Sequence, residues 1–257
     1  MKSSENFLKL HQQSDPLLLG NIWDVQSAKV FSDKSFQALG TSSAAVANSF
    51  GYEDGEDVPF KLIVQLAKRV VEVVEIPLSV DIEGGFGNNA ISVCENIEKL
   101  YDVGVAGINI EDSLPGKGRT LRATAEFAKM LDAVINQLAR KNMQIFMNVR
   151  TDGFLLGLPN PLVESIQRIK VYENLGVNGI FIPCITTHED IRKIVASTQL
   201  PVNVMCMPDL PSFDELRQLG VKRISMGNSL HKLMQETHAH HLDLITMNQS
   251  FKSLFQH

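Results

Sequence analysis

Acidic side chains follow two apolar runs in the first half of the chain. Asp81 and Glu83 come directly after PLSV, and Glu111 comes directly after GINI. Residues two apart on an extended strand point to one side, so Asp81 and Glu83 are expected to converge with Glu111 from the next strand. Mg²⁺ prefers oxygen ligands and keeps several of its waters while it binds one or two carboxylates. We therefore predict a Mg²⁺ or Mn²⁺ site at Asp81, Glu83 and Glu111, formed partly through water.

Each acidic residue taken alone also has a structural interpretation. An Asp between a strand and a helix commonly caps the helix, and we prefer this interpretation for Asp112. Several carboxylates at one place repel one another unless a positive charge is bound among them. Helix capping therefore accounts for Asp112 but not for the convergent set of three.

Other apolar runs end in residues that could bind an organic acid. Arg150 ends the run IFMNV, and its guanidinium offers a planar fork to a substrate carboxylate; the alternative is a structural partner for an acidic residue. Ser42 and Ser43 lie in a turn of small residues, where hydroxyl and backbone N–H groups could bind another substrate oxygen. Asn203, in the run LPVNVMCMP, is a further candidate for substrate binding.

Eight short apolar runs must position these side chains. They cover residues 16–24, 36–46, 76–83, 105–112, 144–152, 177–185, 200–208 and 221–229. Amphipathic helical patterns between them cover residues 59–75, 90–103, 123–141, 162–175 and 188–197. Apolar strands separated by helices indicate a parallel sheet covered on both faces. We predict one α/β domain over residues 1–257, a (β/α)8 TIM barrel with residues 230–257 as a helical extension; a doubly wound open sheet is the alternative.

Composition and charge exclude several classes of protein. The net charge is −5 and no cluster of Lys and Arg interrupts the chain, so we expect no nucleic-acid partner. No run approaches the roughly 18 apolar residues of a membrane helix, and the first residues lack the apolar core of a secretory signal. Cys94, Cys184 and Cys206 are scattered without a CxxC pair, which favours a reducing, cytoplasmic compartment. We interpret the late histidines His238, His240 and His241 as a solvated helix face.

Three other enzyme chemistries lack their motifs. The stretch GGFGN does not have the spacing of a dinucleotide fingerprint. No strand end carries the lysine that a Schiff-base aldolase needs, and no GxSxG elbow indicates a serine hydrolase.

Five ordered motifs are similar to those of one enzyme superfamily. They are GTSSAAVANSFGYEDGE (40–56), VDIEGGFGN (80–88), GINIEDS (107–113), VRTDGF (149–154) and IFIP (180–183). With these motifs the chain resembles the isocitrate lyase/phosphoenolpyruvate mutase superfamily, as a phosphonomutase-like member of uncertain substrate. The resemblance implies a Mg²⁺-dependent barrel that breaks or forms a C–C or P–C bond of a small 2-oxo or 2-hydroxy acid through an enolate.

The resemblance also implies roles for individual residues. Ser42, Ser43 and Ala44 match the loop that holds the substrate carboxylate and oxo oxygen, and Asp54 matches an aspartate near the reacting centre. Asp81, Glu83 and Glu111 match the acidic set around Mg²⁺, and Arg150 matches an arginine that binds a carboxylate or stabilises the enolate. Members of this superfamily exchange their last helices between subunits, which implies a homotetramer or homodimer here.

Departures from the family pattern reduce the number of reactions that the enzyme is expected to catalyse. Glu83 stands where the family usually has Asp. The loop SLPGKGRT lacks the catalytic cysteine of KKCGH, so a standard isocitrate lyase is not expected. Pro183 and Cys184 replace the histidine and serine of phosphonopyruvate enzymes, which disfavours phosphoryl transfer. We therefore expect a decarboxylase, hydrolase or C–C lyase that acts on an oxaloacetate-like acid. The alternative is a catalytically silent binding or sensor protein. The segment 113–121 is expected to form a lid over the site.

Overall fold

The computed structural model describes residues 3–114 and 118–255. Its main sheet is parallel, and its strands follow the order β1-β11-β10-β9-β8-β5-β4-β3-β2. The strands are β1 (Leu17–Leu18), β2 (Gly20–Ile22), β3 (Leu39–Thr41), β4 (Leu78–Asp81), β5 (Gly107–Glu111), β8 (Phe146–Arg150), β9 (Gly179–Ile182), β10 (Val202–Met205) and β11 (Arg223–Ser225). Each predicted apolar run therefore contains strand residues.

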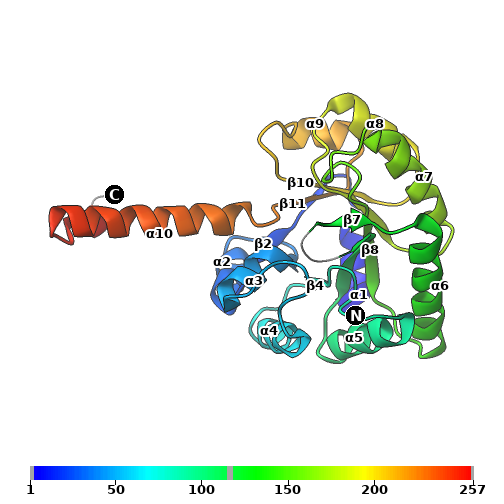
Figure 1. Ribbon diagram of the computed structural model, residues 1–257, viewed down its shortest axis with the longest axis horizontal. Coiled ribbons are helices and arrows are strands. Elements are labelled where there is room, and N and C mark those ends of the chain that lie inside the picture. Colours follow the sequence, from blue (N-terminus) through cyan, green and yellow to red (C-terminus); the bar gives the residue numbers. More distant parts are fainter. Residues whose placement is uncertain (1–2, 115–117, 256–257) are drawn as a thin grey trace.

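The two edges of this sheet come from one continuous stretch of chain. β1 pairs with β11 and β2 pairs with β3, and only Leu19 separates β1 from β2. The Leu19 N–H donates to the Ile224 carbonyl oxygen at 2.9 Å, and the Gly20 N–H donates to the Ala38 carbonyl oxygen at 3.2 Å. The sheet thus closes into an α/β barrel (Figure 1), so the predicted TIM-barrel fold is confirmed and the open-sheet alternative is wrong.

Helices surround the barrel because each presents one apolar face to the sheet. They are α2 (Val25–Asp33), α3 (Ser43–Phe50), α4 (Phe60–Val73), α5 (Ala90–Asp102), α6 (Thr124–Arg140), α7 (Pro161–Glu173), α8 (His188–Ala196) and α9 (Phe213–Gln218). In α4 the buried residues are Ile63, Leu66, Ala67 and Val70, which follow helical spacing. The five predicted helical patterns correspond to α4 through α8.

A short helix closes the end of the barrel at which the strands begin, which we call the base. In this helix, α1 (Ser3–Leu10), the ring of Phe7 meets that of Phe146 edge to face, with 5.2 Å between the ring centroids. The opposite end, where the strands finish, is the mouth. Because α1 closes the base, a ligand reaches the barrel from the mouth.

The predicted strand at 36–46 is too long. β3 ends at Thr41, and α3 begins at Ser43. Ser42 has extended backbone and caps α3, because its side-chain oxygen accepts the Ala45 N–H at 3.4 Å. The alanines that continue this run are good helix formers once a cap is present.

The segment after β5 folds partly as a hairpin. β6 (Ser113–Leu114) pairs antiparallel with β7 (Thr120–Leu121). The predicted lid includes residues 115–117, which lie outside the described residues, so the lid stays a prediction.

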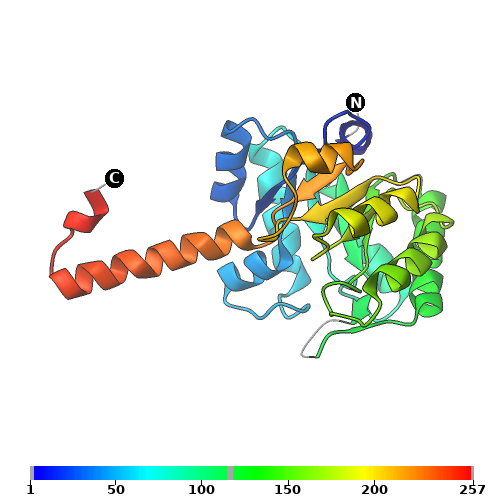
Figure 2. The ribbon, with the colours of Figure 1, turned by 90° about the horizontal axis from the view of Figure 1, so that it is seen from above.

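The final helix leaves the barrel. α10 (Ser229–Asn248) projects away from the other elements, and η1 (Lys252–Phe255) follows it (Figures 1 and 2). Exposed large apolar side chains lie along this extension: Leu233, Met234, Leu242, Met247, Phe251, Leu254 and Phe255. His238 and His240 are also exposed, in agreement with a solvated helix face, whereas His241 is half-buried. Within the described ranges, no helix is long and apolar enough to cross a membrane.

Candidate active site

A cavity of about 320 Å³ opens at the mouth of the barrel. Six of the predicted site residues line it, namely Ser42, Ser43, Ala44, Asp54, Asp81 and Arg150. The remaining wall is mixed polar and apolar and consists of Asn21, Thr41, Asn109, Arg119, Leu155, Phe181, Met205, Ser225, Gly227 and Asn228. The folded chain therefore gathers these six residues from separate segments of the sequence around one small cavity.

Two buried carboxylates hold Arg150 on the cavity wall. The Arg150 Nε donates to Asp152 Oδ1 at 2.6 Å, and its Nη2 donates to Asp152 Oδ2 at 3.1 Å. Its Nη1 lies 3.1 Å from Glu111 Oε2. Asp152 and Glu111 have side chains 0% and 1% exposed, so this pairing occurs away from water. The structural interpretation of Arg150 and its predicted place in the site are thus compatible, since the paired side chain also faces the cavity.

A second arginine, which sequence analysis missed, enters the same wall from the segment before β7. The Arg119 Nη1 lies 3.0 Å from Glu111 Oε1 and 3.4 Å from Asp152 Oδ2. Its Nη2 lies 3.4 Å from Asp54 Oδ2. The available signal was an arginine in the loop SLPGKGRT, directly after the strand that ends in Glu111.

Asp81 lies at the end of β4 with hydrogen-bond partners but without a cation. Its Oδ1 accepts the Glu83 N–H at 3.1 Å, and the Ser43 hydroxyl donates to its Oδ2 at 3.5 Å. The Thr41 hydroxyl oxygen accepts the Asp81 N–H at 2.8 Å and fixes the backbone there. Among the described residues, no Lys, Arg or His lies within ion-pair distance of Asp81. Burial raises the pKa of this carboxyl, although Arg150 opposes the effect.

Glu83 lies beyond the end of β4, so strand alternation does not determine where its side chain points. β4 ends at Asp81, and Glu83 has a left-handed backbone with φ of 49°. Its two carboxylate oxygens accept the Glu56 N–H at 3.1 and 3.0 Å. Burial and the nearby charges of Asp54 and Asp81 together raise its pKa to about 8. The argument from alternate strand positions is therefore wrong for Glu83, but the charge of Asp81 acts on both Glu83 and Glu111.

These residues fit a hydrated divalent cation better than a cage of direct ligands. In the part of the chain that is described, no group of three or more His, Cys, Asp or Glu side chains is arranged to hold a metal ion. Mg²⁺ needs only one or two protein carboxylates when waters and substrate complete its shell. Asp81 suits this role because it faces the cavity without a cationic partner, whereas Glu111 already contacts two guanidiniums.

Asp112 does not cap a helix, contrary to the preferred prediction. The next helix, α6, begins at Thr124. Asp112 is instead fully buried, where its Oδ2 accepts hydrogen bonds from Arg168 Nη1 at 3.1 Å and from the Tyr172 hydroxyl at 2.9 Å. Its Oδ1 accepts the Asp152 N–H at 3.2 Å. The ion pair with α7 outweighs capping, and Asp112 supports the backbone of the residue that holds Arg150.

Asn203 lies in the barrel interior and does not line the cavity. Its side chain is 1% exposed, and its Nδ2 donates to the Val204 carbonyl oxygen at 2.6 Å and to Ser225 Oγ at 3.1 Å. The Asn148 Nδ2 donates to Asn203 Oδ1 at 3.2 Å. The hydrogen bond to Ser225 joins β10 to the neighbouring strand β11, and the one from Asn148 joins β10 to β8 across the barrel interior.

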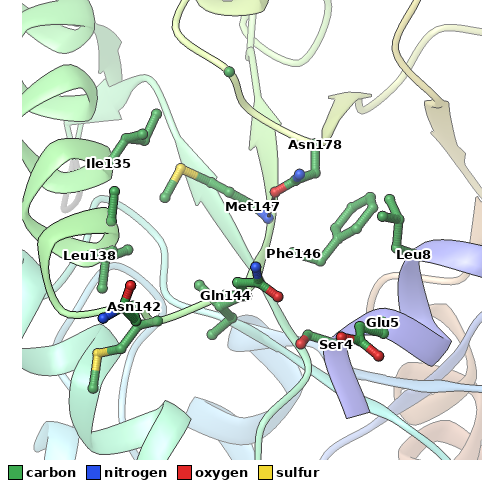
Figure 3. Close-up of a pocket in the computed structure, with 14 residues that line it drawn as sticks. Ser4, Glu5, Leu8, Ile135, Leu138, Asn142, Gln144, Phe146, Met147 and Asn178 are labelled. Atoms are coloured by element: carbon green, nitrogen blue, oxygen red, sulfur yellow. Dashed lines mark hydrogen bonds between the residues drawn. The ribbon is translucent and has the colours of Figure 1, made fainter. Parts of the chain in front are cut away.

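A larger cavity of about 610 Å³ lies at the base, between α1, the end of α6 and the start of β8. Figure 3 shows Leu8, Ile135 and Phe146 on its wall together with Ser4 and Asn178. Glu5 is the one ionisable side chain among its lining residues. The groups that could perform acid chemistry gather at the mouth, so the smaller cavity is the candidate active site.

Comparison with known proteins shows the family to which the chain belongs. Residues 7–246 match the phosphoenolpyruvate phosphomutase family. The chain is 32% identical over 228 residues to an uncharacterized protein of Mycobacterium tuberculosis, with 87% of this chain and 82% of that protein covered. It is 26% identical over 218 residues to an oxaloacetate decarboxylase of Pseudomonas savastanoi pv. phaseolicola, with 81% and 73% covered.

Among solved structures, a candidate phosphonomutase from Burkholderia cenocepacia aligns with a TM-score of 0.88 and 34% identity. That alignment covers 94% of this chain and 99% of the other. The motifs, the closed barrel and the family match agree with one another. The chain therefore belongs to the phosphoenolpyruvate phosphomutase family and is a lyase of the isocitrate lyase/phosphoenolpyruvate mutase type.

Proposed function

We propose that this enzyme cleaves a C–C bond of a small oxaloacetate-like 2-oxo acid, by decarboxylation and through an enolate. The observation that carries the proposal is Arg150, which faces the cavity while Asp152 and Glu111 hold it in place. An anchored guanidinium is suited to an oxygen that gains negative charge during the reaction. The similarity to an oxaloacetate decarboxylase supports the same substrate class.

The start of α3 provides the groups to bind the substrate carboxylate. The Ser42 side chain caps Ala45, so the N–H groups of Ser43 and Ala44 are left for a ligand within the described structure. Both residues line the cavity. These N–H groups and the Ser43 hydroxyl would orient the acid so that its oxo oxygen faces Arg150.

In the proposed reaction, the bond between C3 and the distal carboxylate breaks and CO₂ leaves. The electron pair forms the C2–C3 double bond, and the negative charge moves to the oxygen on C2, where Arg150 stabilises it. A proton taken up at C3 then gives pyruvate. Asp54, which lines the cavity with a side chain 40% exposed, would pass this proton from water.

A divalent cation is the proposed cofactor, Mg²⁺ or Mn²⁺. Asp81 would hold it directly, and Asp54, Glu83 and Glu111 would contact its waters. When bound, the ion would supply further positive charge for the enolate oxygen. The position of Asp81 on the cavity wall, without a cationic partner among the described residues, supports this assignment.

The missing acid/base favours decarboxylation over cleavage of a 2-hydroxy acid. Cleavage next to a hydroxyl group requires a base to remove the hydroxyl proton. The loop from Ser113 to Leu121 contains neither cysteine nor histidine. Loss of CO₂ from a 2-oxo acid begins without such a base, because the departing carboxylate leaves its electron pair behind.

Turnover of a panel of acids with Mg²⁺ tests the proposal. Oxaloacetate should yield CO₂ and pyruvate, whereas 2-methylisocitrate and phosphonopyruvate should be poor substrates. Oxalate and acetate as products would indicate a hydrolase instead. If ligands bind but no acid is turned over, the alternative of a sensor or binding protein replaces the enzyme proposal.

We further propose that α10 packs against another subunit, giving a homotetramer or homodimer in the cytoplasm. The support is the projecting helix and its exposed apolar side chains, such as Leu233 at 56% and Met247 at 79% exposed. An apolar surface of this kind needs a partner surface. A monomeric mass by light scattering at micromolar concentration would contradict the assembly.

A further inference from the structure

Arg119 and Arg150 form one unit on the cavity wall because they share the same two buried carboxylates. Glu111 lies between them, with its Oε1 3.0 Å from Arg119 Nη1 and its Oε2 3.1 Å from Arg150 Nη1. Asp152 Oδ2 likewise accepts from Arg119 Nη1 at 3.4 Å and from Arg150 Nη2 at 3.1 Å. Two guanidiniums and two carboxylates thus balance in charge and fix each other's positions.

The two arginines differ in how fully their donors are used. Arg150 is held by short contacts of 2.6 and 3.1 Å with Asp152. Arg119 has one short ion-pair contact, 3.0 Å from its Nη1 to Glu111 Oε1, but its hydrogen bonds to Asp54 and Asp152 are 3.4 Å, which is long compared with about 2.7–2.9 Å for charge-assisted bonds. A guanidinium has five N–H donors. Arg119 therefore keeps donors for a stronger acceptor in the cavity that it lines.

We propose that Arg119 is a substrate-binding residue, which together with Arg150 clamps one anionic end of the acid between two guanidiniums. This inference rests on the proposed function, because it assigns a residue to the anion site of the same reaction. The wall beside the pair includes Phe181 and Leu155, which exclude water and strengthen charge interactions. The clamp selects a ligand with adjacent oxygens that carry or gain negative charge, such as a carboxylate next to an oxo group.

Calorimetric titration with oxalate in saturating Mg²⁺ tests the clamp without relying on turnover. Arg119→Gln should weaken oxalate binding about 10- to 100-fold, since a hydrogen bond to a charged group is lost. Arg119→Lys should recover only part of the affinity, because an ammonium cannot form the planar fork. Arg140→Gln is the control: it removes one positive charge from the exposed end of α6 and should leave oxalate affinity unchanged.

The outcomes separate this inference from the function on which it depends. Oxalate binding that is equal in the wild type and Arg119→Gln would overturn the clamp and leave the proposed function standing. A lower melting temperature with unchanged oxalate affinity would show that Arg119 only anchors its loop, and this too overturns the clamp. Failure of the wild type to bind either oxalate or oxaloacetate would overturn both proposals.

Discussion

Charge is handled in opposite ways at the two ends of the barrel. At the mouth, carboxylates outnumber guanidiniums, because Asp54 and Asp81 line the cavity in addition to the balanced set around Arg150. At the base, Arg223 is 1% exposed, and within the described chain it has no carboxylate at ion-pair distance. Its Nη2 donates to Asn109 Oδ1 at 3.2 Å. Burial lowers the pKa of Arg223 to about 9.

The difference shows which end is built to receive a ligand. At the base, His11 stays neutral beside Arg223, because burial and the nearby Arg223 lower the pKa of the His11 ring to about 3. The mouth keeps a surplus of negative charge that a divalent cation can offset, beside guanidiniums that can meet an organic anion. Charge at the mouth should therefore matter for catalysis, and charge at the base for stability.

The largest expected effect is at the mouth, in Arg150→Ala. We expect kcat to fall about 10²–10³-fold, because the side chain stabilises an oxygen that is more negative in the transition state than in the ground state. Steady-state kinetics on oxaloacetate and a thermal melt of the same preparation measure both effects. The exposed arginine variant Arg69→Ala should match the wild type in both.

A near-normal kcat together with a depressed melting temperature would reverse the assignment of Arg150. It would mean that this guanidinium serves mainly to neutralise Glu111 and Asp152. The mouth would then resemble the base, with charge buried for structural reasons.

Sequence patterns predicted the barrel because its signals are local. Apolar runs and amphipathic helical patterns alternate along the chain, and each strand end then marks a position at the mouth. The contacts of Arg119 and Asp112 could not be predicted in this way. Arg119 meets Asp54, 65 residues away, and Asp112 meets Arg168, 56 residues away, whereas capping rules consider only the next few residues. The position of Glu83 could not be predicted from strand periodicity, because Glu83 lies beyond the end of β4 and has a left-handed backbone.

At the base, His11 should make stability depend on pH. Its ring stacks on Phe146 at 4.2 Å between centroids and is 3% exposed, and its pKa is lowered from 6.5 to about 3. The unfolded chain takes up this proton as the pH falls below 6.5 while the folded chain does not, so stability present above pH 6.5 is lost on acidification. One pH unit corresponds to about 1.4 kcal/mol, so the contribution of His11 to the free energy of unfolding should fall by about 2 kcal/mol between pH 6.5 and 5.

Denaturant unfolding at these two pH values measures the contribution of His11. In His11→Gln the decrease should be smaller than in the wild type by about 2 kcal/mol, since glutamine does not titrate. The exposed histidine variant His238→Gln should keep the wild-type pH dependence. Equal decreases in His11→Gln and the wild type would show that the base does not exclude the proton.

The smallest expected effect is at the mouth, and it is the stabilisation of the folded protein by Mg²⁺ without substrate. A ligand that binds only the folded state at ten times its Kd stabilises it by about 1.4 kcal/mol. Mg²⁺ should therefore raise the free energy of unfolding of the wild type by about this amount over protein kept in EDTA.

The gain should disappear in Asp81→Asn, because the carboxylate without a cationic partner is lost. It should persist in His11→Gln, whose change lies at the base. A gain that is the same in Asp81→Asn as in the wild type would place the cation elsewhere, and the surplus of carboxylates at the mouth would then need another explanation.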